Sequence, residues 1–182
     1  MAIIEPRTVT LKDGASCILR VPEVGDAEAV LAYARAHINE NAGSISAPEE
    51  FTITLEEERK WIASHRDNPD DLLLVADLDG VAGLINFKAA ERRRLRHNGS
   101  FGVGVRNDLR GRGIGRALIE RLLDWARANP RLEKVSLQVL ADNANAIALY
   151  RKLGFIEEGR RPKQVRYEDG RHVDDILMYV MV

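Results

Sequence analysis

The stretch Arg110-Gly111-Arg112-Gly113-Ile114-Gly115-Arg116 combines three glycines with three arginines. A short apolar run, residues 100–105, precedes it, and residues 117–126 follow with apolar side chains at helical spacing. The stretch therefore marks the passage from a strand into a helix. A helix start offers unpaired backbone N–H groups and the positive end of the helix dipole, and glycines let an anion come close to them. The sequence predicts a phosphate-binding loop at this turn.

Two common phosphate-binding loops can be compared with these residues. A dinucleotide loop, G-x-G-x-x-G, requires a third glycine at position 116, where this chain has Arg116. A nucleoside triphosphate loop requires Gly-Lys followed by Ser or Thr, a combination that occurs nowhere in the sequence. The pattern that remains is [Q/R]-x-x-G-x-[G/A], which Arg110, Gly113 and Gly115 match.

A second segment follows at a distance that leaves room for one helix and one strand. Residues 143–155 read Asn-Ala-Asn-Ala-Ile-Ala-Leu-Tyr-Arg-Lys-Leu-Gly-Phe. Together the two segments resemble the coenzyme A loop and the N-x-x-A-x-x-L-Y-x-K-x-G-F segment of the GNAT superfamily of N-acetyltransferases. The resemblance covers residues 70–182 well, and the first 70 residues only in the order of their elements. The chain looks most like bacterial members that acetylate small amines, amino acids or protein N-termini.

Composition and length favour one soluble domain, residues 1–182, without linkers or internal repeats. The chain has 182 residues, 45% of them hydrophobic, which is enough for a substantial core. A net charge of −1 predicts no general attraction to nucleic acid or to a membrane surface. No apolar run reaches the ~18 residues of a membrane span, and the start lacks the pattern of a signal peptide, so we expect a cytoplasmic protein. Cys17 is the single cysteine, and we expect no bound metal.

The order of the expected elements predicts an α/β fold with a mixed sheet whose central strands are flanked by helices. Hairpins are expected within residues 8–21 and 72–87. One helix is expected from an Asp26 cap to about Ala36, and another from the capping box Thr54–Glu57 to about His65. The later strands and helices are expected at residues 100–105, 113–129, 135–140, 143–153, 155–158, 164–167 and 175–182. This order is similar to that of the GNAT fold.

The resemblance implies a site for acetyl-CoA. The backbone at residues 103–105 would pair with the pantetheine arm, and the amides of residues 111–116 would hold the pyrophosphate. Asn143 matches a position that contacts the coenzyme, and asparagine is also a favoured helix N-cap. Lys152 would either reach a coenzyme phosphate or stay solvated. The residues assigned to the coenzyme are Val103, Gly104, Val105, Arg110, Gly111, Arg112, Gly113, Ile114, Gly115, Arg116, Asn143 and Lys152.

Acetyl transfer to an amine needs an acid for the leaving thiolate and a base for the amine. Tyr150 is the candidate acid, because a phenol with a pKa near 10 is protonated at neutral pH; packing or anchoring the coenzyme is its alternative role. The resemblance places Gln138 where relatives often carry a glutamate that acts as the general base. The side-chain amide of Gln138 cannot accept the proton of the amine. The base is therefore open between His97, whose ordinary pKa suits neutral pH, Glu40 and a chain of water molecules.

These residues predict an N-acetyltransferase that moves acetyl from acetyl-CoA to a primary amine of a small molecule or a protein N-terminus. The resemblance implies direct attack in a ternary complex. We expect residues 39–48 to form one wall of the acceptor site, and Asp174 and Asp175 either to attract a cationic amine or simply to begin a strand. The missing acidic base leaves an alternative, a non-catalytic acyl-CoA-binding sensor on the same fold. C-terminal tails of this family also build dimer contacts, so a homodimer is compatible with the sequence.

Overall fold

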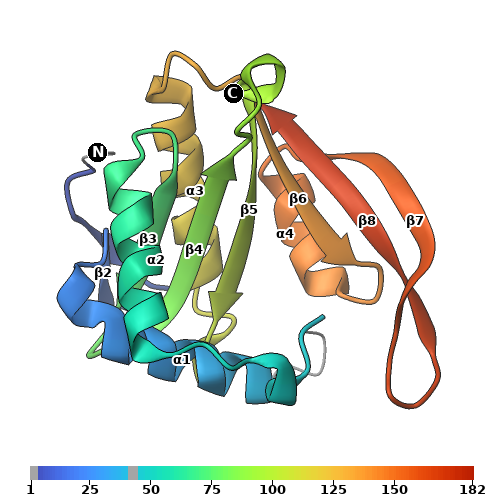
Figure 1. The fold of residues 1–182 in the computed structure, drawn as a ribbon, viewed down its shortest axis with the longest axis horizontal. Coiled ribbons are helices and arrows are strands. Elements are labelled where there is room, and N and C mark those ends of the chain that lie inside the picture. Colours follow the sequence, from blue (N-terminus) through green and yellow to red (C-terminus); the bar gives the residue numbers. More distant parts are fainter. Residues whose placement is uncertain (1–3, 41–44) are drawn as a thin grey trace.

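The computed structural model describes residues 4–40 and 45–182, apart from the side chain of Glu40. Its strands form one mixed sheet in the order β1-β2-β3-β4-β5-β6-β8-β7, in which β5 and β6 alone are parallel neighbours within the described residues (Figure 1). The strands are β1 (Arg7–Thr10), β2 (Ser16–Arg20), β3 (Leu72–Asp77), β4 (Val81–Ala89), β5 (Asn98–Val105), β6 (Lys134–Leu140), β7 (Ile156–Arg166) and β8 (His172–Met181). The predicted α/β class with a mixed sheet is confirmed.

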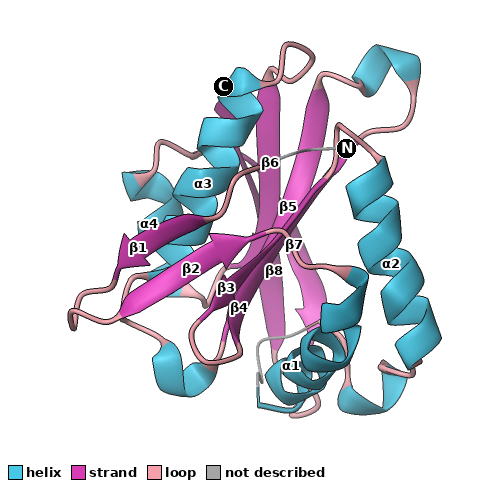
Figure 2. Ribbon diagram, turned by 90° about the vertical axis from the view of Figure 1, so that its left-hand side faces the viewer, coloured by secondary structure: helices cyan, strands magenta, loops and turns pink. Residues whose placement is uncertain are grey.

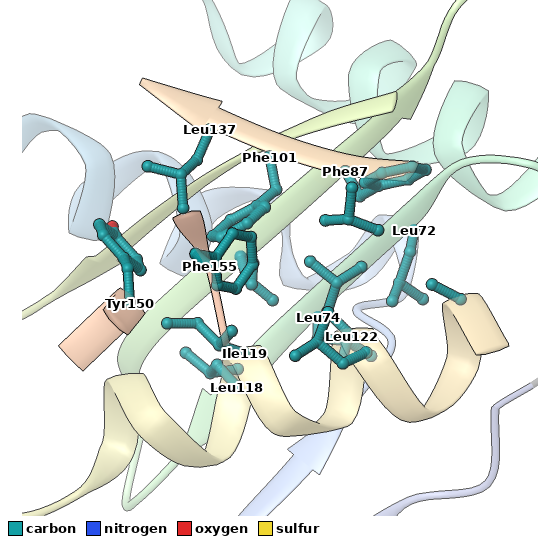
Figure 3. Close-up of a cluster of buried hydrophobic side chains, with 14 of the residues drawn as sticks. Leu72, Leu74, Phe87, Phe101, Leu118, Ile119, Leu122, Leu137, Tyr150 and Phe155 are labelled. Atoms are coloured by element: carbon teal, nitrogen blue, oxygen red, sulfur yellow. The ribbon is translucent and has the colours of Figure 1, made fainter. Parts of the chain in front are cut away.

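Helices cover both faces of this sheet. The helices α1 (Ala27–Glu40) and α2 (Leu55–Asp67) lie on one face, and α3 (Ile114–Ala128) and α4 (Ala144–Lys152) lie on the other (Figure 2). The apolar stripe of α3, which includes the fully buried Leu118 and Leu122, packs against strand residues such as Leu74 and Phe87 (Figure 3). Each such buried side chain contributes roughly 1.5–3 kcal/mol to folding. The sheet thereby lies between the two helix pairs.

The start of α1 differs from the expected cap. Asp26 lies in a short 3-10 turn before the helix, where its carboxylate pairs with Arg20 at 2.7 Å and accepts the Glu23 N–H at 2.7 Å. The helix also runs to Glu40, one turn beyond the predicted end at Ala36. By contrast, the Thr54 capping box is confirmed, with the Thr54 hydroxyl oxygen accepting from the N3 amide of α2 at 3.3 Å.

The C-terminal hairpin is longer than expected. The two short strands predicted at residues 155–158 and 164–167 are one strand, β7, which pairs with β8 through two register shifts. The second shift surrounds Lys163, whose φ of 53° places it in the left-handed region. The bulged residues interrupt the alternation of side chains, and this interruption is why the sequence pattern indicates two strands.

Gly99 on β5 makes one close contact that a larger residue could not make. A Cβ atom on Gly99 would lie 2.0 Å from Cζ of Phe87, whose buried ring packs edge-on against Trp125. We therefore expect Gly99→Ala to lower the free energy of unfolding by about 2 kcal/mol, because the ring must leave its place. Gly159→Ala on β7 is the matched control, since no atom lies within 4 Å of its added Cβ. Urea unfolding measures both, and equal stabilities of the two variants would contradict the prediction.

Candidate active site

The strands β5 and β6 pair at one end and separate at the other. Among the described residues their ladder comprises three pairs, from Asn98↔Lys134 to Ser100↔Ser136. Beyond that point β5 stays paired with β4, β6 stays paired with β8, and a gap opens between them (Figure 1). Residues 101–105 therefore present a free strand edge to this opening. An extended ligand can pair with such an edge as an added strand.

The glycine loop lies where the free edge of β5 ends and α3 begins. Gly111 and Gly113 have φ angles of 79° and 101°, which glycine adopts without strain. Within the described part of the chain, the amides of residues 111–116 have no hydrogen-bond acceptor, and the first bond of α3 runs from the Ala117 N–H to the Gly113 carbonyl at 3.0 Å. Six successive amides at the positive end of a long helix form a cradle suited to an anion.

The arginine side chains of the loop are engaged with the protein itself. Their partners are the Asp13 carboxylate for Arg112, the Val105 carbonyl oxygen for Arg110 and the Glu120 carboxylate for Arg116. The backbone of Arg112 is also held, because its carbonyl accepts the Lys12 N–H at 3.0 Å. In this arrangement the side chains fix the shape of the loop, and the backbone amides are the groups that remain for a ligand. Contact of the arginine side chains with the coenzyme stays a prediction.

Tyr150 projects from α4 at the edge of the aromatic core. Its ring lies edge-on to Phe101 and Phe155, with centroid distances of 6.1 and 5.9 Å. The hydroxyl points away from the leucines on α3 (Figure 3). Burial raises the pKa of Tyr150 to about 12, so the phenol is protonated throughout the neutral range. It can donate a proton, which is the chemistry predicted for it.

The remaining predicted coenzyme residues lie at the two ends of α4. Asn143 is the N-cap, and its side-chain oxygen accepts the Ala146 N–H at 3.2 Å. The capping role is confirmed, while its coenzyme contact stays a prediction. Lys152, in the last turn of the helix, is exposed.

The candidates for the base fall in different places. His97 precedes β5 at the paired end, where its carbonyl accepts the N–H groups of Glu133 and Lys134 at 2.9 and 3.1 Å. Val103 lies six residues further along an extended strand, roughly 20 Å away, so the structure does not bring His97 to the opening. Gln138 is exposed on β6. The side chain of Glu40 lies outside the described part of the chain.

This placement yields a prediction for His97. We expect His97→Ala to keep the acidic limb of the pH–rate profile, because His97 lies roughly 13 Å before the start of the free edge at Phe101 and roughly 20 Å before Val103. Initial rates between pH 5.5 and 9 measure the profile. Loss of the acidic limb in this variant would make His97 the base after all.

Two side chains that the sequence analysis did not single out lie over the same segment of β5. Tyr33 and His37 are one turn apart on α1, and their rings stack with centroids 5.6 Å apart. A Cβ atom on Gly104 would lie 2.6 Å from the Tyr33 hydroxyl oxygen and 2.8 Å from Nε2 of His37. Their spacing of four residues was visible in the sequence as one helix face. Only the packing of α1 against the sheet shows what that face meets.

The two aspartates at the start of β8 are both partnered. Asp175 is 5% exposed and pairs with Arg161 at 3.4 Å, and burial raises the pKa of its carboxyl above the ordinary value. Asp174 accepts the Lys163 N–H at 2.8 Å, and this bond, together with Arg160, lowers the pKa of its carboxyl. Asp175 is the direct β-ladder partner of Leu140 at the end of β6, beside the opening. Attraction of an amine by either carboxylate stays a prediction.

A mixed sheet that opens between two parallel strands, with an amide cradle at the end of one of them, defines an acyl-coenzyme A transferase fold. The chain matches the Acetyltransferase (GNAT) family over residues 37–155, and it belongs to this family. It is 31% identical to the L-amino acid N-acetyltransferase AaaT of Escherichia coli K12 over 157 residues, which cover 83% of this chain and 96% of that protein. The resemblance inferred from the sequence is confirmed.

Solved structures agree with this assignment. The GNAT-family acetyltransferase from Streptococcus pneumoniae superposes with a TM-score of 0.88 at 28% identity, over 91% of this chain and 99% of the other. The yncA acetyltransferase of Salmonella typhimurium, solved with acetyl-CoA, shares the fold with a TM-score of 0.80 at 22% identity, over 92% and 94% of the two chains. The chain is thus an enzyme of the acetyltransferase class. Within residues 4–40 and 45–182, no helix is long and apolar enough to cross a membrane.

Proposed function

We propose that the protein transfers the acetyl group of acetyl-CoA to a primary amine of a small molecule or a protein N-terminus. One observation carries this proposal: the free edge of β5 leads directly into the six amides of residues 111–116. A single extended cosubstrate can use both, with its pyrophosphate at the amides and its pantetheine arm along residues 103–105. When bound there, acetyl-CoA supplies an activated acetyl group as a thioester.

The protein's own groups then have distinct tasks. The amide cradle and the dipole of α3 bind the two negative charges of the pyrophosphate and set the position of the thioester. The strand edge orients the arm so that the amine attacks directly, within a ternary complex. Tyr150 holds a proton on its phenol for the departing thiolate, and its position on the α4 side keeps this donor away from bulk water.

The candidates for the acceptor amine come from one relative and from the polar residues near the opening. The AaaT relative is an L-amino acid N-acetyltransferase, which puts amino acids first among the candidates. Gln138 on β6 and the buried Asp175, the ladder partner of Leu140, are polar groups suited to a small cationic amine. Residues 41–44 of the segment expected to line the acceptor site lie outside the described residues.

Release of free thiol from acetyl-CoA tests the proposal, with the purified protein and a panel of amino acids, polyamines, aminoglycosides and N-terminal peptides. We expect acceptor-dependent release with at least one class. If no amine of the panel causes thiol release but calorimetry shows tight acetyl-CoA binding, the result would favour a non-catalytic sensor. If the protein neither releases thiol nor binds acetyl-CoA, the assignment of the amide cradle to the pyrophosphate would be contradicted.

Homodimerisation and a cytoplasmic location stay predictions. Sedimentation velocity at micromolar concentration distinguishes a dimer from a monomer. A chain that sediments at its 20.4 kDa monomer mass would contradict the dimer.

A further inference from the structure

A groove lies at the end of the sheet where β5 and β6 are still paired. It has a volume of about 640 Å³ and opens to solvent. Its walls come from the end of β4, the turn that follows β4 and the paired ends of β5 and β6. The polar side chains in these walls are Lys88, Glu91, Arg92, Asn98, Ser100 and Ser136. None of the residues assigned to the coenzyme is among those described in the walls, so the groove is separate from the amide cradle.

The groove lies on the face of the sheet that α3 and α4 do not cover. On β5, a Cβ atom on Gly99 would meet the buried ring of Phe87, and the ring of Phe101 packs against Tyr150. Side chains alternate along a strand, so Ser100 points to the opposite face, where it is exposed. The hydrophobic core occupies the α3 and α4 face, and an acceptor amine therefore approaches the opening from the side of the groove.

The groove begins where the opening ends. Ser100 and Ser136 are the last ladder pair of β5 and β6 among the described residues, and both line the groove. Phe101, the next residue of β5, starts the free strand edge that faces the opening. A ligand whose amine lies in the opening can therefore continue along the sheet into the groove.

The end of the groove remote from the opening is basic. Lys88 and Arg92 line it, and the turn after Arg92 adds the exposed Arg93 and Arg94. None of these three arginines has an ion-pair partner within residues 4–40 and 45–182. Glu91 is the one carboxylate among the described lining residues, and it lies 3.8 Å from Nζ of Lys88 in an exposed pair. Such exposed pairs contribute little, so an anionic ligand can replace Glu91 as the partner of Lys88.

Asn98 lies between these charges and the opening, two residues before Ser100 on the same face of β5. Its side-chain oxygen is buried and has no hydrogen-bond partner in the described part of the chain. A buried acceptor without a donor is uncommon, and the N–H of a peptide is a donor that can satisfy it. Lys134, the ladder partner of Asn98, is engaged elsewhere, because its ammonium pairs with Glu158 and lies over the ring of Tyr179.

The distance from the opening to the basic end sets the length of the ligand. Asn98 lies three residues before Phe101 and five before Val103, which is roughly 10 to 17 Å along an extended strand. Arg92 lies further still, since Ala90 is the residue whose N–H bonds to the Asn98 carbonyl, at 2.9 Å. A free amino acid carries its amine and its carboxylate on one residue and does not span this distance, whereas three to five residues of extended peptide do.

We propose that the acceptor is a peptide N-terminus with acidic side chains near its third to fifth residues, and that Lys88 and Arg92 bind these carboxylates; the inference rests on the proposed function. The amine lies in the opening, a peptide N–H donates to Asn98, and the acidic side chains pair with the two cations. Lys88 and Arg92 thus determine specificity without touching the reacting atoms. This assignment places acidic peptides ahead of the free amino acids that the AaaT relative suggests.

The first test compares three acceptors with the wild-type protein. The acidic peptide is an amidated hexapeptide with glutamate at its third, fourth and fifth residues, the neutral peptide has glutamine there, and the third acceptor is free glutamate. We expect kcat/KM for the acidic peptide to exceed that for the neutral peptide about tenfold at low salt, and the difference to shrink in about 0.5 M NaCl. Equal values for the two peptides, or a higher value for free glutamate, would overturn the inference.

The second test changes the charges of the groove. We expect the double variant Lys88→Gln, Arg92→Gln to reduce the tenfold preference for the acidic peptide to about twofold. Glu91→Gln removes a negative charge from the groove and is expected to increase the preference. The matched control is Arg59→Gln, Lys60→Gln on α2, two exposed cations that each have a carboxylate at a similar distance, 3.7 and 3.9 Å. This control is expected to keep the preference of the wild type.

Binding and turnover separate the inference from the proposed function. Fluorescence anisotropy of the labelled acidic peptide, with coenzyme A present, measures binding without turnover, and melting temperatures control for misfolding. An active wild type beside a double variant that keeps the full preference would overturn the inference and leave the proposed function standing. A wild type that binds acetyl-CoA but acetylates no amine would contradict the proposed function, and the inference with it.

Discussion

Replacement of Tyr150 by Phe is expected to lower kcat about 100-fold while the dissociation constant for acetyl-CoA stays nearly unchanged. Phenylalanine keeps the edge-on packing against Phe101 and Phe155 and removes only the proton donor. The leaving thiolate must then take its proton from water, which is less well placed. If Tyr150 only packs against its neighbours, the Phe variant is expected to keep the kcat of the wild type.

Single-turnover thiol release and calorimetry measure the two constants, and the melting temperature of the variant controls for misfolding. The raised pKa of Tyr150, about 12, has a further consequence. The protonated phenol persists as the pH rises to 10, so a basic limb below pH 10 does not come from this residue. Full turnover in Tyr150→Phe would remove the tyrosine from the proton path.

Replacement of Gly113 by Ala is expected to weaken acetyl-CoA binding at least about tenfold, the effect of losing one hydrogen bond to a charged group. The φ of 101° at this N-cap of α3 costs an L-residue about 1–2 kcal/mol, so the backbone relaxes. The amides on either side of position 113 then change direction. The added methyl group itself meets nothing closer than 3.8 Å, so a steric clash does not explain the loss.

Gly170→Ala is the matched control for this prediction. Gly170 has a similar φ of 82°, in the turn between β7 and β8, and its added Cβ atom meets no atom within 4 Å. Both variants should lose a similar amount of stability in urea unfolding, and only Gly113→Ala should lose affinity in calorimetry. Equal affinity in the two variants would mean that the loop amides do not bind the pyrophosphate.

The features that sequence analysis predicted correctly are local. The Thr54 capping box, the Asn143 N-cap and the left-handed Gly154 each depend on a few neighbouring residues and on the φ angles or side-chain oxygens available there. The order of strands and helices follows from periodicity within single segments. The glycine loop also belongs to this class, because a strand, a turn and a helix start are contiguous in the chain.

The features that sequence analysis missed depend on contacts between distant segments. The last turn of α1 carries His37, which stacks on Tyr33 and packs over Gly104, 67 residues later. The single strand β7 exists because β8 pairs with it across two bulges. Neither contact leaves a periodic signal in its own segment.

The same distinction applies to the site. The sequence by itself determined the family, and it predicts the coenzyme loop and Tyr150 as the candidate acid, because these features lie in two short segments with characteristic spacing. Which histidines lie near the opening depends on which end of β5 faces it, and this follows from the point where β5 and β6 separate. His97 precedes the paired end of that strand, whereas α1 brings His37 to the open end. Only the tertiary structure shows where each of them lies relative to the opening, because strand separation is a property of the whole sheet.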